Sequence, residues 1–149
     1  MKPRYAPLDA FVPILASTDK WQAIEELVGA LEPLGLVRDG ALALRDLLDR
    51  ERSLSTGMTD GLAIPHARTR SVTRRCVALG LSPAGMDFDS IDGRPAHVVL
   101  LALTPKTGAW PHLEYLADLA RAYSDPVWRA ELASCGSLEE ARAVLQRKL

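Results

Sequence analysis

Cysteine is scarce in this sequence of 149 residues: Cys76 and Cys135 are the two cysteines, and they form no CxxC pair. A chain of this size buries enough surface to fold without disulfides or a structural metal. Sparse cysteine is typical of a reducing compartment, so we expect a cytoplasmic protein. Both thiols are expected to act as small buried apolar groups rather than as reactive ones.

Long hydrophobic runs and an excess of one charge are also missing. The longest unbroken apolar stretch covers residues 98–103, far short of the ~18 residues that suggest a membrane span. Residues 1–10 lack the apolar segment of a signal peptide. The formal net charge is −1, so there is no general positive field to bind nucleic acid or an anionic membrane. We expect neither nucleic-acid binding nor direct membrane insertion.

The common catalytic and nucleotide-binding motifs are absent. The sequence has no GxxxxGK[ST] or GxGxxG loop to bind nucleotide phosphates, no HExxH zinc motif and no GxSxG nucleophile elbow. The three histidines, His66, His97 and His112, do not follow a usual metal-ligand spacing. We therefore expect no metal and no cofactor.

Two amphipathic helices are predicted in the first third of the chain. Asp19 with Gln22 three residues later is typical of a helix-capping box, and apolar residues then recur at helical spacing until Pro33. A second helix is predicted from about residue 41 to residue 50. The Ser-, Thr- and Gly-rich stretch 53–61 has no period and is predicted to be a loop.

Short apolar strands are predicted between these helices and a second helical group. The candidate strands cover residues 62–64, 76–81 and 98–103, with an edge strand at 11–15. Their continuous rather than alternating apolar character indicates a sheet covered on both faces. Helices are predicted at 112–123, from Pro126 to about residue 133, and after the capping box of Ser137 and Glu140. The order of elements predicts an α/β sandwich of three layers.

His66 and His97 occupy different positions relative to the predicted strands. His66 follows strand 62–64 and Pro65, and we expect the chain to turn at residues 67–69. The imidazole would then lie at a strand end beside the 53–61 loop, a position that suits a functional group and a structural one equally. His97 opens an apolar run, so we expect a structural role at the rim of the sheet.

His112 and Arg50 each allow two interpretations. His112 follows Pro111 in the first turn of a predicted helix, where the helix dipole disfavours the imidazolium. A neutral ring there could donate one N–H to an anion, or it could be a capping residue that faces solvent. Arg50 could be a solvated helix end, or its guanidinium could face an oxyanion near His66.

The segment from Arg50 to Arg68 resembles the motif of the type 2 EIIA domains of the bacterial phosphoenolpyruvate-dependent sugar phosphotransferase system. That pattern is an arginine, a Ser/Thr–Gly loop and a short strand ending in Pro-His, here Pro65-His66. A second histidine, His112, opens a Leu-rich helix as in the family. The resemblance covers about residues 11–145, and it implies a single EIIA domain over 1–149 with a mixed, mannitol-type sheet covered by helices on both faces.

The resemblance also implies a phosphotransferase activity. His66 would accept a phosphoryl group from phospho-HPr and pass it to an EIIB domain for sugar uptake. Arg50 and a neutral His112 would stabilise the transferring group, with Ser55 and Thr56 as lesser phosphate donors. Neutral imidazole is a competent nucleophile near pH 7, and this transfer needs no metal or cofactor.

A regulatory role is the alternative that the same resemblance implies. In the nitrogen-class relatives, the phosphorylation state of the equivalent histidine controls partner proteins. The sequence includes no permease, EIIB or HPr domain, which slightly favours a free-standing component but does not decide between the two roles, because sugar EIIA proteins can also be separate chains. Two residues depart from the family pattern: Thr59, where relatives often have glycine, and Trp110, where they have small or acidic residues. An unrelated His-dependent hydrolase or metal protein is a third, less favoured class.

Overall fold

The computed structural model describes residue 5 and residues 7–149. The prediction that residues 1–10 form no signal peptide concerns a segment of which residues 1–4 and 6 lie outside the described residues. Within the described ranges, no helix has both the length and the apolar character needed to cross a bilayer.

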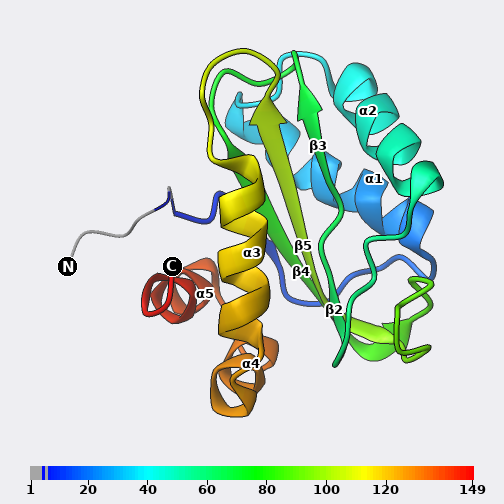
Figure 1. Ribbon diagram of the computed structural model, residues 1–149, viewed down its shortest axis with the longest axis vertical. Helices are drawn as coiled ribbons and strands as arrows, with labels where there is room; N and C mark the ends of the chain where they lie inside the picture. The colour runs from blue at the N-terminus through cyan, green and yellow to red at the C-terminus, as the bar shows by residue number, and fades with distance from the viewer. Residues whose placement is uncertain (1–4, 6) are drawn as a thin grey trace.

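A five-stranded mixed sheet forms the middle layer of the molecule (Figure 1). Its order is β1-β4-β5-β2, and β3 also pairs with β5. β4 and β5 are antiparallel, whereas the β1–β4, β2–β5 and β3–β5 pairs are parallel. The strands are β1 (Ala10–Val12), β2 (Leu62–Ala63), β3 (His66–Thr69), β4 (Cys76–Met86) and β5 (Ala96–Pro105).

Helices cover both faces of this sheet, so the predicted three-layer sandwich is confirmed. One layer contains α1 (Lys20–Leu31), the short 3-10 helix η1 (Glu32–Leu34) and α2 (Gly40–Ser53). The other contains α3 (His112–Tyr123), α4 (Pro126–Ala133) and α5 (Leu138–Gln146). The predicted N-caps are confirmed, since the side chains of Asp19 and Ser137 accept hydrogen bonds from the amides of Gln22 and Glu140.

Two apolar cores lie on opposite sides of the central strands. In β5, Val98, Leu100 and Ala102 pack towards α3–α5, whereas the residues between them pack towards α1 and α2. Successive side chains of a strand point to opposite faces, so a strand buried on both sides contains an unbroken apolar run. The continuous apolar character of 98–103 was therefore a correct sign of a covered sheet.

The predicted turn at residues 67–69 is wrong, because these residues form most of β3. Proline has no N–H to donate to a ladder, so Pro65 separates β2 from β3. The Pro65 carbonyl nevertheless accepts a hydrogen bond from the amide of Ala102, at 3.0 Å, and the chain continues parallel to β5. Ala67 and Thr69 are buried while Arg68 is exposed, and this alternation is that of a half-buried strand.

Both cysteines are buried, as predicted. Burial raises the pKa of Cys76 to about 11, and burial also raises the pKa of Cys135. Both groups are therefore neutral thiols at pH 7, a state in which cysteine is a poor nucleophile.

Candidate functional site

The alternation of side chains along the strands brings the two predicted histidines together. Leu62 and Ile64 pack on the α3 side of the sheet, and the same two-residue period places His66 on that side. His112 is the first residue of α3. The ring centroids of His66 and His112 lie 5.2 Å apart, with a tilt of 55° between the ring planes.

The tautomer of His66 is set by a backbone carbonyl. Its Nδ1 lies 2.7 Å from the oxygen of Ile64, and a carbonyl can only accept a hydrogen bond. Nδ1 therefore carries the proton, and Nε2 of the neutral ring has a free lone pair. Burial lowers the pKa of His66 below 6.5, and the positive charge of Arg50 lowers it further. The half-buried ring is thus neutral at pH 7, the form in which an imidazole can act as a nucleophile.

His112 is buried, with 8% of its surface exposed, so the interpretation as a solvent-facing cap is wrong. Its Nδ1 lies 2.7 Å from Oγ1 of Thr104 in β5. The pKa of His112 falls to about 4, first because the ring is buried and then because it lies near His66, Arg68 and Arg75. The expected neutral ring is confirmed, with burial rather than the helix dipole as the largest cause.

Buried Arg75 contacts the start of α3 through Pro111 and Tyr115. The side chain is 3% exposed, its Nη2 donates to the oxygen of Pro111 at 2.6 Å, and its guanidinium carbon lies 4.5 Å from the ring centroid of Tyr115. Within the described part of the chain, its Nε has no hydrogen-bond partner. Sequence pattern alone did not indicate this buried arginine, because it stands at the border of a strand beside the half-buried Arg74.

Arg50 lies in the last turn of α2, and its Nη1 donates to the oxygen of the C-cap residue Leu54 at 2.8 Å. The interpretation as a helix-end cation is therefore correct. Its positive charge also lowers the pKa of both His66 and His112. The two interpretations of Arg50 are thus compatible, since the guanidinium closes the helix and lies near the imidazole pair.

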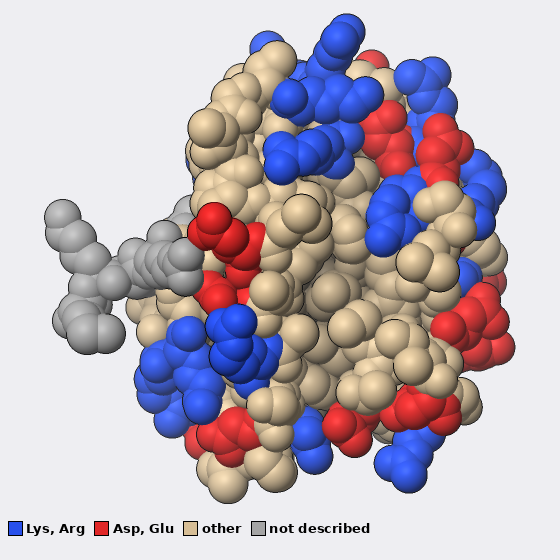
Figure 2. Space-filling view, in the orientation of Figure 1, with Lys and Arg blue, Asp and Glu red and all other residues tan. Residues whose placement is uncertain are grey.

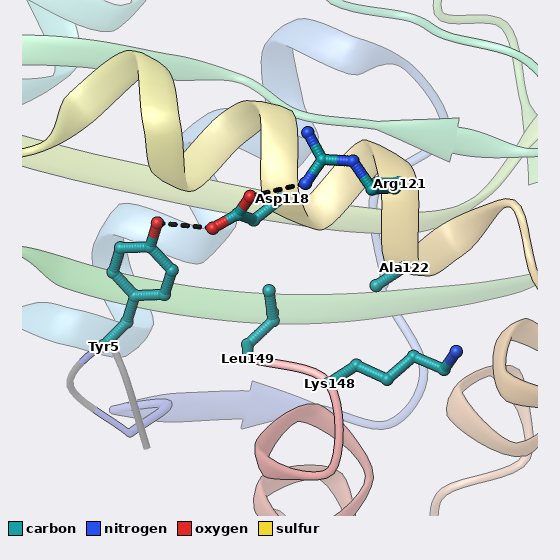
Figure 3. A pocket seen from close by; sticks show the side chains of 6 residues that line it. All are labelled: Tyr5, Asp118, Arg121, Ala122, Lys148 and Leu149. Atoms are coloured by element: carbon teal, nitrogen blue, oxygen red, sulfur yellow. Dashed lines mark hydrogen bonds and ion pairs between the residues drawn. The ribbon is translucent and has the colours of Figure 1, made fainter. Parts of the chain in front are cut away.

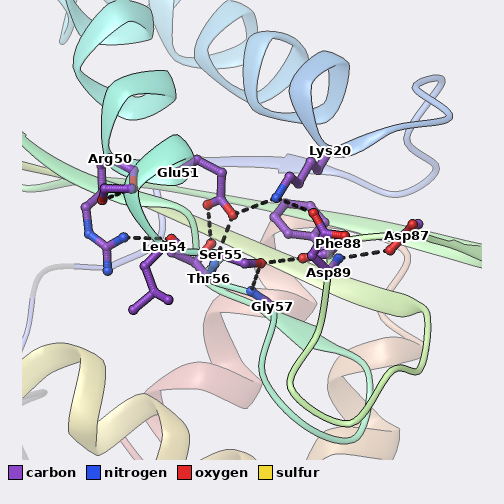
Figure 4. A network of polar contacts seen from close by, with 11 residues as sticks. Lys20, Arg50, Glu51, Leu54, Ser55, Thr56, Gly57, Asp87, Phe88 and Asp89 are labelled. Atoms are coloured by element: carbon purple, nitrogen blue, oxygen red, sulfur yellow. Dashed lines mark hydrogen bonds and ion pairs between the residues drawn. The ribbon is translucent and has the colours of Figure 1, made fainter.

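Glu51 anchors the loop that precedes His66 (Figure 4). This carboxylate is 2% exposed and accepts hydrogen bonds from the amide of Thr56 at 2.9 Å and from its hydroxyl at 2.6 Å. Nζ of Lys20 lies 3.3 Å from Glu51 and 2.9 Å from Asp89. Burial lowers the pKa of Lys20, but the hydrogen bonds and charges of these two carboxylates outweigh it and leave that pKa raised.

Ser55 and Thr56, the predicted phosphate donors, use their hydroxyl protons inside this loop. Oγ of Ser55 donates to the oxygen of Phe88 at 2.5 Å, while the Thr56 hydroxyl donates to Glu51. The carbonyl of Thr56 accepts from the amide of Ile64 at 3.1 Å, which ties the loop to the segment before His66. In this structure both hydroxyls stabilise the loop.

Helical spacing could have identified Glu51 in advance. Ala43, Leu47 and Glu51 follow one another at intervals of four residues, and all three are buried. A carboxylate on the buried stripe of a helix requires a partner, because an unpaired charge is costly in an apolar environment. The partners Lys20 and Thr56 come from other elements, so the sequence alone did not indicate them.

We expect Glu51→Ala to lower the free energy of unfolding by about 3 kcal/mol. This is the lower end of the range for removing one partner of a buried ion pair, because Lys20 keeps its contact with Asp89. Urea unfolding followed by circular dichroism measures the change. Glu25→Ala is a matched control, since this glutamate is exposed in α1 and should contribute less than about 0.5 kcal/mol. Equal effects of the two substitutions would contradict the anchoring role.

His97 lies at the other end of β5 from Thr104. Its side chain is exposed, and its Nδ1 lies 3.0 Å from the oxygen of Ser82. This position agrees with the predicted place at the rim of the sheet.

Thr59 does not need to be glycine, because the left-handed residues of its loop are Asp60 and Gly61, with φ of 58° and 87°.

Positive side chains surround part of the face that carries the histidines. Figure 2 shows Lys and Arg gathered at the upper part of this face, near the ends of β3 and β5. Arg68, Arg70 and Lys106 are exposed there. A separate hollow lies between α3 and the C-terminal residues, where the Tyr5 hydroxyl donates to Asp118 (Figure 3). None of the predicted site residues lines that hollow.

In the described ranges, no group of three His, Cys, Asp or Glu residues could hold a metal ion.

Known proteins of similar sequence include components of phosphotransferase systems and nitrogen regulatory proteins. The fructose-specific EIIA component of Haloferax volcanii is 37% identical over 123 residues, which cover 83% of this chain and 80% of that protein. The fructose-specific EIIABC component of Bacillus subtilis is 38% identical over 106 residues, or 71% of this chain. The chain spans only 17% of the length of that relative.

Solved structures share the fold. The nitrogen regulatory protein IIA-Ntr of Neisseria meningitidis matches with a TM-score of 0.82 and 31% identity, over 91% of this chain and 92% of that one. Enzyme IIA of the mannitol system of Escherichia coli, solved in complex with phosphorylated enzyme IIB, matches with a TM-score of 0.76 and 21% identity. That alignment covers 91% of this chain and 92% of that one.

A family model confirms the resemblance that the Arg50–His66 motif suggested. The model described as "Phosphoenolpyruvate-dependent sugar phosphotransferase system, EIIA 2" matches residues 10–148, nearly the whole chain. The chain therefore belongs to the EIIA type 2 family of the phosphoenolpyruvate-dependent sugar phosphotransferase system.

Proposed function

We propose that this chain is a phosphocarrier that accepts a phosphoryl group on Nε2 of His66 from phospho-HPr and passes it to an EIIB domain for sugar uptake. The supporting observation is the His66 ring itself. Ile64 holds its proton on Nδ1, its pKa is lowered, and a second neutral imidazole lies 5.2 Å away. The free Nε2 lone pair is the nucleophile that this transfer requires.

The transfer step is balanced without any added acid, base or oxidant. The Nε2 lone pair of His66 attacks the phosphorus atom of the donor phosphohistidine and forms a new N–P bond. The old N–P bond breaks, and its electron pair returns to the donor imidazole. The proton of His66 stays on Nδ1 throughout, hydrogen-bonded to the oxygen of Ile64, so no proton must leave the site. Because both leaving and attacking groups are imidazoles, the free-energy change is small and the step is reversible.

The surroundings suit a group that carries negative charge. Phosphoryl transfer asks the protein mainly for alignment and charge stabilisation. In this proposal Arg50 supplies a guanidinium and His112 an N–H, while Arg68 and Arg75 add positive charge near the imidazole pair. Glu51, the carboxylate whose charge acts on His66, already accepts three hydrogen bonds from Thr56 and Lys20. Ser55 and Thr56 could bind phosphoryl oxygens only by exchanging their present acceptors.

The proposed partners, HPr as donor and an EIIB domain as acceptor, are inferred from membership of the family. A phosphohistidine donor must place its phosphorus atom in line with Nε2 of His66, which a folded carrier such as HPr can do. The acceptor is proposed to be an EIIB domain, since the mannitol relative of the same fold was solved with phosphorylated enzyme IIB. No general charge on the chain draws these partners, so docking depends on local surface complementarity.

Intact mass after incubation tests the proposal. The chain is mixed with phosphoenolpyruvate, enzyme I and HPr, and we expect a gain of about 80 Da, the mass of one phosphoryl group. Omitting HPr should prevent the gain, which separates transfer from direct phosphorylation. An unchanged mass in the complete mixture, with HPr itself phosphorylated, would contradict the proposed function.

Regulation is the second candidate, and the likeness to IIA-Ntr of Neisseria meningitidis at 31% identity favours it. In this role the phosphorylation state of His66 would control partner proteins instead of feeding a permease. The two functions differ in the fate of the phosphoryl group. Rapid transfer from the phosphorylated chain to fructose- or mannitol-class EIIB domains supports sugar uptake, whereas its retention in the presence of both supports regulation.

His112 is proposed to stabilise the phosphoryl group without carrying it. We expect His112→Gln, which keeps a donor amide, to slow phosphorylation of His66 by about 10-fold. His112→Ala removes the donor and should approach the roughly 100-fold loss expected for one preorganised donor. Quench-flow measurement of the rate, followed by peptide mapping at alkaline pH, checks both variants. Finding the phosphate on His112 in the wild-type protein would reverse the two roles.

A further inference from the structure

Thr104 is a buried polar residue that the proposed chemistry has not used. It stands near the end of β5, is 0% exposed, and pairs in register with Arg68 of β3. The two-residue period that directs Ala102 towards α3 directs Thr104 to the same side. Its Oγ1 lies 2.7 Å from Nδ1 of His112, and the whole β5–α3 connection separates the two residues in the chain.

The direction of this hydrogen bond follows from counting protons. Either group can donate in principle, because a hydroxyl is donor and acceptor and a neutral imidazole has one N–H. Across the described part of the chain, Nδ1 of His112 is the only hydrogen-bond partner of Oγ1 of Thr104. If Nδ1 were the donor, the buried hydroxyl proton would have no acceptor, and such an unsatisfied group is costly. The hydroxyl is therefore the donor.

We propose that Thr104 is a positioning residue that fixes the tautomer of His112: its hydroxyl donates to Nδ1 and so keeps the ring proton on Nε2. This inference rests on the proposed phosphoryl transfer. The two histidines then have complementary tautomers. His66 has its proton on Nδ1 and a lone pair on Nε2, whereas His112 has a lone pair on Nδ1 and its proton on Nε2. One ring is ready to bond phosphorus, and the other is ready to donate to a phosphoryl oxygen.

Nitrogen NMR of the unphosphorylated protein tests the tautomer directly. In wild-type protein labelled with ¹⁵N histidine at pH 7, we expect the Nε2–H form of His112 and the Nδ1–H form of His66. The Nδ1–H form of His112 as the main species would overturn the inference. This measurement needs no HPr, so it stands even if the chain accepts no phosphoryl group and the proposed function fails.

Variants at position 104 test the effect on transfer. Thr104→Val keeps the shape and removes the hydroxyl, so we expect the Nδ1–H form of His112 to become detectable and phosphorylation of His66 to slow by about 10-fold. The KM for phospho-HPr should stay unchanged, because Thr104 is buried away from any partner. Thr104→Ser restores the hydroxyl and should restore both the tautomer and the rate.

Thr69→Val is the matched control. Thr69 is also 0% exposed, its hydroxyl accepts a hydrogen bond from the amide of Ser71, and its period in β3 places it on the opposite side of the sheet. This variant should leave the His112 tautomer and the transfer rate unchanged. A wild-type rate in Thr104→Val, or an equal loss of rate in Thr69→Val and Thr104→Val, would overturn the inference.

Discussion

Substituting His66→Ala is expected to abolish phosphoryl acceptance. The variant loses the only side chain at the site with a free nucleophilic lone pair in the proposed mechanism, and neutral His112 is held as a donor. The gain of about 80 Da after incubation with phosphoenolpyruvate, enzyme I and HPr should disappear. Mass spectrometry measures the endpoint, and acid-labile phosphate measures the rate. We expect at least a 1,000-fold loss, since no group remains to form the N–P bond.

His97→Gln is the matched control for this loss. His97 is an exposed histidine at the opposite end of β5, bonded to the oxygen of Ser82. The variant should accept phosphate at the wild-type rate and to the same extent. A His66→Ala protein that still gains phosphate at the normal rate would rule out His66 as acceptor, and a folded His97→Gln protein that gains none would give His97 a role in transfer.

Arg50→Ala is expected to slow transfer by about 100-fold or more, the scale for losing one preorganised group that stabilises the transition state. The free energy of unfolding should fall by only about 0.3–1 kcal/mol, because the side chain closes a helix end with one hydrogen bond to Leu54. Rapid-quench kinetics with phospho-HPr, beside urea unfolding of the same sample, separates the two effects.

Two further substitutions sharpen this result. Arg50→Lys keeps the charge but loses the planar fork, so a loss equal to that of Arg50→Ala would indicate bidentate binding of phosphoryl oxygens. Arg52→Ala removes the other cation in the last turn of α2, an exposed side chain that pairs with Asp49 at 2.9 Å. It should transfer at the wild-type rate. Unimpaired transfer in Arg50→Ala would remove Arg50 from the site.

Most of the fold could be predicted because its signals are local. Capping residues such as Asp19 and Ser137 mark helix starts by hydrogen bonds to amides three residues away. Unbroken apolar runs marked strands buried on both sides. The error at residues 67–69 has a non-local cause: the four residues of β3 carry no long apolar run, and pairing with β5 is what makes them a strand.

The candidate site residues likewise divide into those that local sequence signals predict and those that only packing brings into place. His66, His112 and Arg50 could be found from the sequence because they lie at element ends within a motif. Thr104 and Arg75 could not, since each acts through a contact with the start of α3 that only the packed structure creates. Glu51 lies between these cases: its helical spacing could have indicated a buried carboxylate, but its partners come from other elements and could not be predicted. Residues that hold other residues in place have no motif of their own.

Arg50 and Glu51 are neighbours in the chain with opposite tasks, and Figure 4 shows them leaving α2 towards different sides. Successive residues of an α-helix project about 100° apart around the helix axis. A single orientation of α2 about its axis therefore directs both side chains correctly. A one-residue insertion or deletion inside α2 would rotate the last turn of the helix by about 100° about the helix axis. The guanidinium of Arg50 and the carboxylate of Glu51 would then both point in the wrong direction. We therefore expect homologous chains to vary the exposed composition of this helix freely while keeping the number of residues between Asp39 and Arg50 constant.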